Sequence, residues 1–113
     1  MMVEIEKTEG IWFFRIGANL DAASAPDMHR QIDSLREGIP QDCVVDLTDT
    51  EFMDSSGVGV LVKLYRRLEL EGGRLCLCGA NGQPKSLIIS LKIEQVIPLY
   101  PNPTAAIKSF QSS

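Results

Sequence analysis

Apolar and polar residues alternate at the start of the chain, and a helical spacing follows. Residues 3–7 (VEIEK) alternate strictly, which predicts a half-buried strand. Residues 11–16 (IWFFRI) are aromatic and β-branched, which predicts a second strand. Because the turn residues 8–10 (TEG) separate them, the two strands are expected to form an antiparallel hairpin.

A loop and a helix are predicted over residues 20–38. Ser24 is the expected N-cap, with Asp27 three residues later. Gly38 is the expected C-terminal stop. The apolar residues of this segment recur at helical spacing and should form its buried stripe: Met28, Ile32 and Leu35.

A strand, a helix and another strand are predicted in the middle of the chain. Residues 43–47 (CVVDL) form a continuous apolar run, typical of a strand buried on both faces. Residues 58–71 have helical spacing, end at Gly72 and Gly73, and are followed by a strand at residues 74–78 (RLCLC). The expected buried face of this helix is Val58, Leu61, Val62, Tyr65 and Leu68, widened by Val60 and Leu64.

The last third predicts two helices around a weak strand. Residues 81–93 predict a short helix, and its apolar run 86–90 (SLIIS) either packs in the core, as we favour, or forms a patch for a second partner. Leu87, Ile88 and Leu91 would share its buried face. Residues 95–100 (QVIPLY) predict a strand that Pro98 confines to a sheet edge.

The final helix should begin after Asn102, with Pro103 as its first residue. Its apolar residues Ile107 and Phe110 should face inward. Residues 1–113 are therefore expected to form a single α/β domain. Its single mixed sheet would be mostly parallel, with an N-terminal hairpin and about four helices.

Composition argues against several classes of function. The net charge is −4 and no cluster of basic residues exists, which argues against binding nucleic acid or an anionic membrane surface. The start of the chain lacks the pattern of a signal peptide, so a cytoplasmic protein is expected. A monomer is expected too, since no helix pattern suggests an oligomer seam.

The residues suited to metal or nucleophilic chemistry are sparse. The three cysteines, Cys43, Cys76 and Cys78, lie in apolar strands at a spacing that fits no zinc pattern, so they are expected to be reduced and buried. His29 is the single histidine, which argues against a His-dependent nucleophile or a multi-histidine metal site. We therefore expect no catalytic residues, no metal and no cofactor.

The most unusual segment is residues 52–61 (FMDSSGVGVL), where a buried strand leads into a buried helix. A nucleophile elbow would require a glycine two residues before the serine. Met53 occupies that position relative to Ser55, and Asp54 occupies it relative to Ser56. A phosphate-binding P-loop would require a lysine directly after the second glycine. Neither the hydrolase nor the P-loop pattern is present.

Two interpretations of this segment remain. Asp54 or a serine can cap the helix, with Gly57 and Gly59 allowing tight packing against the sheet. The segment can also be a switch, because a serine at an exposed helix N-terminus can carry a phosphate. The nearby acids Asp46, Asp49, Glu51 and Asp54 would add to its negative charge, so a docked acidic or apolar partner would be released.

Residues 44–79 resemble the central stretch of STAS domains, and in particular the bacterial anti-sigma factor antagonists. The similarity lies in the strand ending in Asp46, the segment 52–59 (FMDSSGVG), and the pair Gly72 and Gly73 before the next strand. Residues 20–32 resemble the family's first loop and helix, with Asp21 at the family's aspartate, and residues 93–107 resemble its closing strand and helix.

This resemblance implies a partner-switching mechanism. The unphosphorylated protein would bind an anti-sigma factor, itself an ATP-dependent serine kinase, and so release the sigma factor. The kinase would phosphorylate Ser55, with Ser56 as second choice, the phosphoprotein would dissociate, and a phosphoserine phosphatase would restore it. The expected partner-binding residues are Asp21, Asp54, Ser55, Ser56, Gly57 and Gly59.

Two other functions fit the same family. The chain could be a non-phosphorylated STAS adaptor in a stress-signalling or lipid-transport complex, where Asp54 and Ser55 are only a helix cap. It could also be a STAS domain that senses a nucleotide at the helix N-terminus. Phosphorylation of Ser55 would favour the switch, and a ligand-induced thermal shift would favour the sensor.

Overall fold

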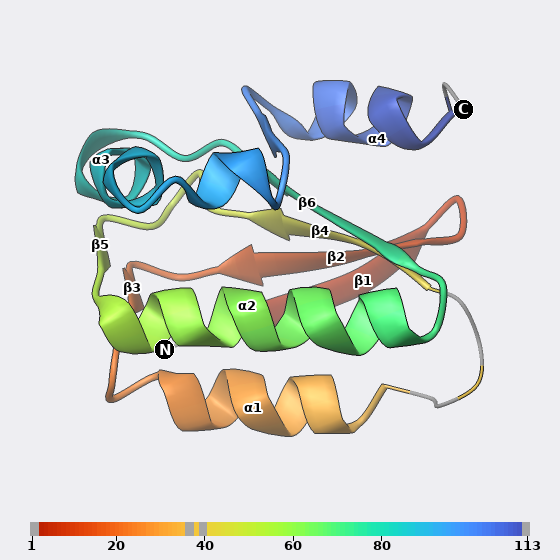
Figure 1. Cartoon of the computed structure of the whole chain (residues 1–113), viewed down its shortest axis with the longest axis horizontal. Helices are drawn as coiled ribbons and strands as arrows, with labels where there is room; N and C mark the ends of the chain where they lie inside the picture. The colour runs from red at the N-terminus through yellow and green to blue at the C-terminus, as the bar shows by residue number, and fades with distance from the viewer. Residues whose placement is uncertain (1–2, 36–37, 39–40, 112–113) are drawn as a thin grey trace.

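The protein has an α/β fold, shown in Figure 1 by a computed structural model that describes residues 3–35, 38 and 41–111. Its elements in chain order are β1 (Val3–Thr8), β2 (Ile11–Ile16), β3 (Asn19–Leu20), α1 (Ala25–Asp33), β4 (Asp42–Asp46), β5 (Phe52–Met53), α2 (Ser55–Leu70), β6 (Arg74–Cys78), α3 (Gly82–Ser90), the 3₁₀ turn η1 (Ile93–Gln95), β7 (Leu99–Tyr100) and α4 (Pro103–Gln111). The predicted order of the main-sheet strands and the helices is confirmed.

The main sheet has five strands in the order β1-β2-β4-β6-β7. β1 and β2 form the predicted antiparallel hairpin, and the pairs β2–β4, β4–β6 and β6–β7 are parallel. The predicted mixed, mostly parallel sheet is therefore confirmed, with β7 on its edge. Strands β3 and β5, which pair in parallel as a separate two-stranded sheet, were not predicted.

Helices cover both faces of the main sheet. Figure 1 shows α1 and α2 side by side on one face and α4 on the opposite face. The larger buried cluster lies between the sheet and α1 and α2, and a smaller one lies beneath α4. β4 contributes to both clusters, because Cys43 and Val45 point toward α2 while Val44 points toward α4. This confirms the prediction of a strand buried on both faces.

The boundaries of α1 correct two predictions. Ser24 occupies the N-cap position, but its side chain makes no capping hydrogen bond to the helix. The helix ends at Asp33, since the backbone N–H of Ser34 bonds to the carbonyls of Arg30 and Gln31. The predicted stop at Gly38 is therefore wrong, and the Gly38 N–H instead donates to Glu71 Oε2 at 2.8 Å.

The buried face of α2 is rotated from the predicted stripe. The fully buried side chains of this helix are Val60, Leu61, Leu64 and Leu68. Val58, Val62 and Tyr65 are only half-buried. α2 packs against both β6 and α1. The side chains that lie between these two contact surfaces are therefore buried most deeply.

The apolar run of α3 is divided between core and surface. Ile88 is fully buried in the main cluster, whereas Ile89 is 49% exposed and Leu91 is 50% exposed. The predicted burial of Leu91 is therefore wrong, because α3 ends at Ser90 and the chain turns through Lys92 in a left-handed conformation. Among the described residues, no helix combines the length and apolar character needed to cross a bilayer.

Candidate functional site

Asp54 joins the start of α2 to the loop before α1. Its backbone is extended, and its Oδ1 accepts a hydrogen bond from the Gly57 N–H at 3.1 Å. Its Oδ2 accepts from the Ala22 N–H at 3.2 Å. The first N–H groups of a helix have no partner within the helix, so a carboxylate here both caps α2 and stabilises its dipole. The predicted cap is confirmed, and the capping residue is Asp54.

Gly57 lets the first turn of α2 approach β3 closely. A Cβ atom at this position would lie 2.1 Å from the carbonyl oxygen of Leu20. The Asp54 N–H donates to the same carbonyl, at 3.4 Å. The glycine is therefore required by the contact between backbones, as the packing interpretation predicted. At Gly59, by contrast, a Cβ atom would meet nothing within 4 Å.

Ser55 is the first residue of α2, and its side chain is exposed. Ser56 follows it and is half-buried. Since the Gly57 N–H is capped and the Val58 N–H donates to the Asp54 carbonyl, the N–H groups of Ser55 and Ser56 are the two that α2 itself leaves without an acceptor. The exposed Ser55 hydroxyl thus lies beside two backbone N–H donors at the N-terminus of a 16-residue helix, where the helix dipole is positive.

Asp21 shapes the loop that lies against this helix start. Its Oδ1 accepts from the Ser24 N–H at 3.1 Å, and Ser24 Oγ accepts from the Asp21 N–H at 2.9 Å. The Ser24 hydroxyl also donates to the Asn19 carbonyl. Ser24 therefore closes the loop instead of capping α1. The Ala22–Asp54 bond brings this loop and the α2 N-terminus together, so Asp21 and Asp54 lie at the same end of the molecule.

The acidic residues of the segment have different environments. Asp46 is only 8% exposed, and its Oδ1 accepts from the Thr48 N–H and hydroxyl. Asp49 and Glu51 are exposed. The expectation that Asp46 contributes to an acidic surface around Ser55 is therefore wrong, because its carboxylate is used inside the turn that follows β4.

Gln83 was not found from the sequence, yet it fixes the other side of the site. Its Oε1 accepts from the Met53 N–H at 2.8 Å, and its Nε2 donates to the Met53 carbonyl at 2.8 Å. This pair of bonds holds the start of α3 against β5, directly before Asp54. Phe52, on the same short strand, is 44% exposed. No pattern in the sequence marks a helical glutamine as the partner of a strand thirty residues earlier.

The residues with nucleophilic or metal-binding groups lie elsewhere. Cys43, Cys76 and Cys78 are buried and free, which confirms the prediction of reduced core thiols. Burial raises the pKa of Cys43 and of Cys76 to about 12, and it raises the pKa of Cys78 as well. Within the described ranges, no three His, Cys, Asp or Glu side chains are grouped as a metal site would require.

Comparison with known proteins agrees with this geometry. The sequence model of the STAS domain matches residues 2–106. The chain belongs to the STAS domain family. This STAS protein is 25% identical over 112 residues to an anti-sigma F factor antagonist of Paenibacillus polymyxa, covering 98% of this chain and 96% of the relative.

Solved structures have the same fold. An anti-sigma factor antagonist from Mycobacterium paratuberculosis superimposes with a TM-score of 0.88 at 22% identity, covering 98% of this chain and 94% of the other. The Bacillus cell fate determinant SpoIIAA in its phosphorylated form superimposes with a TM-score of 0.75 at 21% identity, covering 96% of this chain and 99% of the other. The STAS-like architecture expected from the sequence is confirmed.

Proposed function

We propose that the protein is an anti-sigma factor antagonist that is switched off by phosphorylation of Ser55. The observation that carries the proposal is the exposed Ser55 hydroxyl on the rigidly capped N-terminus of α2. The matched relative of similar length, named an anti-sigma F factor antagonist, supports the same conclusion. The protein then acts as a binding partner, with no chemistry of its own.

The proposed docking surface is the tip formed by the first loop and the start of α2. Its members are the residues expected from the sequence: Asp21, Asp54, Ser55, Ser56, Gly57 and Gly59. Of these, Gly57 is buried and acts by letting the two backbones meet, whereas Gly59 is exposed and leaves room for a partner. The partner is an anti-sigma factor serine kinase, and a phosphoserine phosphatase reverses its action. The antagonist works as a single-domain monomer in the cytoplasm.

Phosphorylation at Ser55 would change the docking surface more than the fold. The added group carries about −1.5 to −2 charges. The helix dipole and the N–H groups of Ser55 and Ser56 offset part of its repulsion from Asp54 within the protein. An anti-sigma factor docked over the tip would instead have to bury that charge, which typically costs about 2–5 kcal/mol when no partner group is provided. Phosphorylation therefore favours dissociation.

The test measures binding of the purified anti-sigma factor from the native host by calorimetry. Ser55→Asp should weaken binding at least about thirtyfold, or about 2 kcal/mol, with an unchanged melting temperature. Ser55→Ala should bind as wild type does and should accept no phosphate from the kinase and ATP, as judged by mass spectrometry. Thr104→Asp is the matched control, since it adds the same charge on the exposed first turn of α4, on the opposite face of the sheet, and should leave the affinity unchanged.

Each result discriminates between the functions. Wild-type affinity for Ser55→Asp would refute the release mechanism, and stoichiometric phosphorylation of Ser55→Ala would make Ser56 or another hydroxyl the acceptor. Failure of the wild-type protein to bind any anti-sigma factor of its host would favour a non-phosphorylated adaptor.

A further inference from the structure

Phe52 carries an exposed aromatic ring close to the proposed phosphorylation site. Among the described residues, five large apolar side chains are exposed: Phe52, at 44%, and Leu70, Ile89, Leu91 and Val96. Of these, Phe52 alone lies within three residues of Ser55 in the sequence. It is not one of the binding residues expected from the sequence, so its exposure requires a separate explanation.

The small sheet of β3 and β5 has an inner and an outer face. Asn19 pairs with Phe52, and Leu20 pairs with Met53. Leu20 is fully buried and Met53 is 1% exposed, whereas Asn19 and Phe52 are both exposed. Because successive side chains of a strand point to opposite faces, the Phe52 ring lies on the outer face.

This outer face continues into the proposed docking tip. The backbone of Asp54 is extended and its N–H donates to the Leu20 carbonyl at 3.4 Å, so the alternation of β5 extends to this residue. Phe52 and Asp54 therefore lie on the same side, with Cα atoms about 7 Å apart. The Cα atoms of Phe52 and Ser55 can be at most about 11 Å apart. A standard interface, with about 800 Å² on each side, is wide enough to include both residues.

The backbone that carries Phe52 is fixed from two directions. The Phe52 N–H donates to the Ala18 carbonyl at 3.1 Å. The next residue, Met53, makes two hydrogen bonds of 2.8 Å to Gln83. An aromatic side chain has only two χ angles, so a ring on a fixed backbone loses little conformational entropy when a partner covers it. Rigid aromatic side chains of this kind are typical of the few residues that dominate binding at a protein interface.

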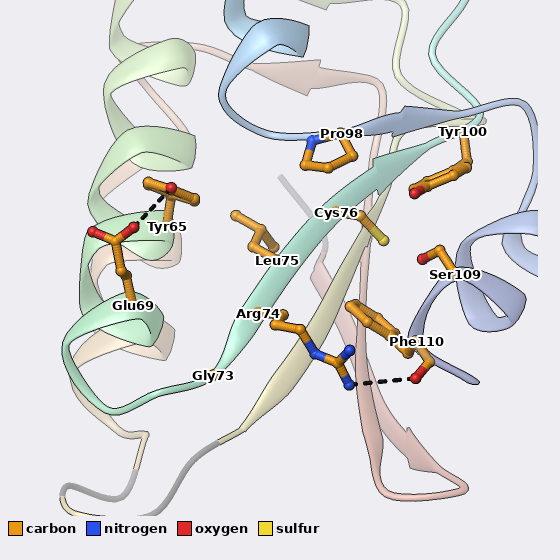
Figure 2. A pocket seen from close by; sticks show the side chains of 10 residues that line it. All are labelled: Tyr65, Glu69, Gly73, Arg74, Leu75, Cys76, Pro98, Tyr100, Ser109 and Phe110. Carbon is orange, nitrogen blue, oxygen red and sulfur yellow. Dashed lines mark hydrogen bonds between the residues drawn. The ribbon is translucent and has the colours of Figure 1, made fainter. Parts of the chain in front are cut away.

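The hollow shown in Figure 2 is a less suitable place for the same partner. It has a volume of about 380 Å³ and lies between the C-terminal half of α2, β6 and α4. Its polar groups already bind one another, since the Tyr65 hydroxyl donates to Glu69 and the Arg74 guanidinium donates to the Phe110 carbonyl. With a rise of about 1.5 Å per residue, Glu69 is roughly 21 Å along α2 from Ser55. A phosphate on Ser55 would therefore not reach a partner bound there.

We propose that Phe52 is the central anchor of the docking surface, and that the anti-sigma factor receives its ring in an apolar pocket. This role rests on the proposed function, because the anti-sigma factor is the partner that docks beside Ser55. Burial of the ring excludes water from the residues around it, and the Ser55 hydroxyl lies within this area. A phosphate on Ser55 would also have to lose its water, which makes a single modification sufficient for release.

Calorimetry with the purified anti-sigma factor of the native host measures what the ring contributes. Phe52→Ala should raise the Kd at least about tenfold, with the circular dichroism spectrum of the folded protein unchanged. Leu70→Ala is the matched control, because Leu70 is an 85% exposed apolar side chain at the other end of α2. This variant should bind as tightly as the wild-type protein.

A second measurement keeps the side chain in place. The chain has four phenylalanines, so incorporation of 4-fluorophenylalanine should give four ¹⁹F signals, and Phe52→Leu identifies the one from Phe52. The anti-sigma factor should shift the Phe52 signal. It should leave the signals of the buried Phe13 and Phe14, and of Phe110 in the hollow of Figure 2, unchanged. Phosphorylation of Ser55 should return the Phe52 signal to its position in the free protein.

The outcomes separate the anchor role of Phe52 from the proposed function. If the wild-type protein binds, a loss below about tenfold for Phe52→Ala, an equal loss for Leu70→Ala, or a shift of Phe110 in place of Phe52 would overturn the anchor role alone. A Phe52 signal that stays shifted after phosphorylation of Ser55 would support the anchor and overturn the release mechanism. Failure of the wild-type protein to bind any anti-sigma factor of its host would overturn both.

Discussion

At the residue scale, Gly57 and Gly59 lie two residues apart in the same motif but are constrained differently. Gly57 is buried against the Leu20 carbonyl, and any side chain there must push two backbones apart. Gly59 faces open space, so only helix propensity and docking act on it. The motif thus combines one glycine required by the fold with another that the fold does not require.

Gly57→Ala should destabilise the protein, because its Cβ would lie 2.1 Å from a backbone oxygen. We expect a loss of about 1–3 kcal/mol despite the better helix propensity of alanine. Gly59→Ala, the matched control, should gain up to about 1 kcal/mol. Urea denaturation followed by circular dichroism measures both, and equal effects would contradict the close contact.

The thiols provide a second prediction at this scale. Because burial raises the pKa of Cys43 and Cys76 to about 12, the native protein should not react with a disulfide thiol reagent at about pH 8, whereas all three thiols should react in denaturant. Unfolded thiols ionise near about pH 8.5, so the unfolded state loses protons first as the pH rises. The contribution of the buried thiols to stability is therefore complete below that pH and is lost progressively toward about pH 12.

At the element scale, the site depends on short pieces held by longer ones. β3 and β5 have two residues each, and no such pair is stable alone. They are held by the Asp54 bonds to the loop before α1 and by the Gln83 bonds from α3. The start of α2 is thereby fixed from both sides, which positions Ser55.

Gln83→Ala should loosen α3 from β5, because it leaves the Met53 N–H and carbonyl without their partner. We expect a loss of about 1–3 kcal/mol. Hydrogen exchange should increase at Met53 and in α3 before it increases in β4. Lys85→Ala is the control, since Lys85 lies in the same helix and is exposed. An equal effect of the two substitutions would show that Gln83 does not hold the strand.

At the scale of the whole molecule, two hydrophobic clusters pack on opposite faces of the main sheet. The cluster beneath α4 contains Phe13, Val44 and Cys76, and Ala106 covers it with no exposed area. β7 ends at Tyr100, and α4 starts directly after Asn102, whose Oδ1 accepts from the Ala105 N–H at 2.9 Å. The predicted cap at Asn102 is confirmed.

Ala106→Asp should separate α4 from the sheet, since it places a charge in a fully buried apolar position. We expect a loss of more than about 3 kcal/mol and binding of a hydrophobic dye. Thr104→Asp introduces the same residue on the exposed first turn of α4, where the helix dipole favours it, and should be neutral or slightly stabilising. Thermal unfolding compares the two, and similar melting temperatures would show that α4 does not cover a core.

Much of this architecture could be read from local patterns. Residues 3–16 predicted the hairpin, the apolar run around Val44 predicted a central strand, and Pro98 and Asn102 predicted an edge strand and a helix start. These patterns can be read from short segments because each one records whether a single strand or helix buries one face or both. The motif around Ser55 similarly indicated a capped helix and an exposed hydroxyl within a STAS domain.

What the sequence by itself determined is therefore the order of the main-sheet strands and the helices, a capped helix start around Ser55, and the family. Only the tertiary structure decided that Ser24 closes a loop, that Asp46 is buried, that Leu91 is exposed and that Gln83 holds β5. The physical reason is that periodicity records whether a residue faces a core, whereas hydrogen bonds between distant segments depend on which segments the fold brings together.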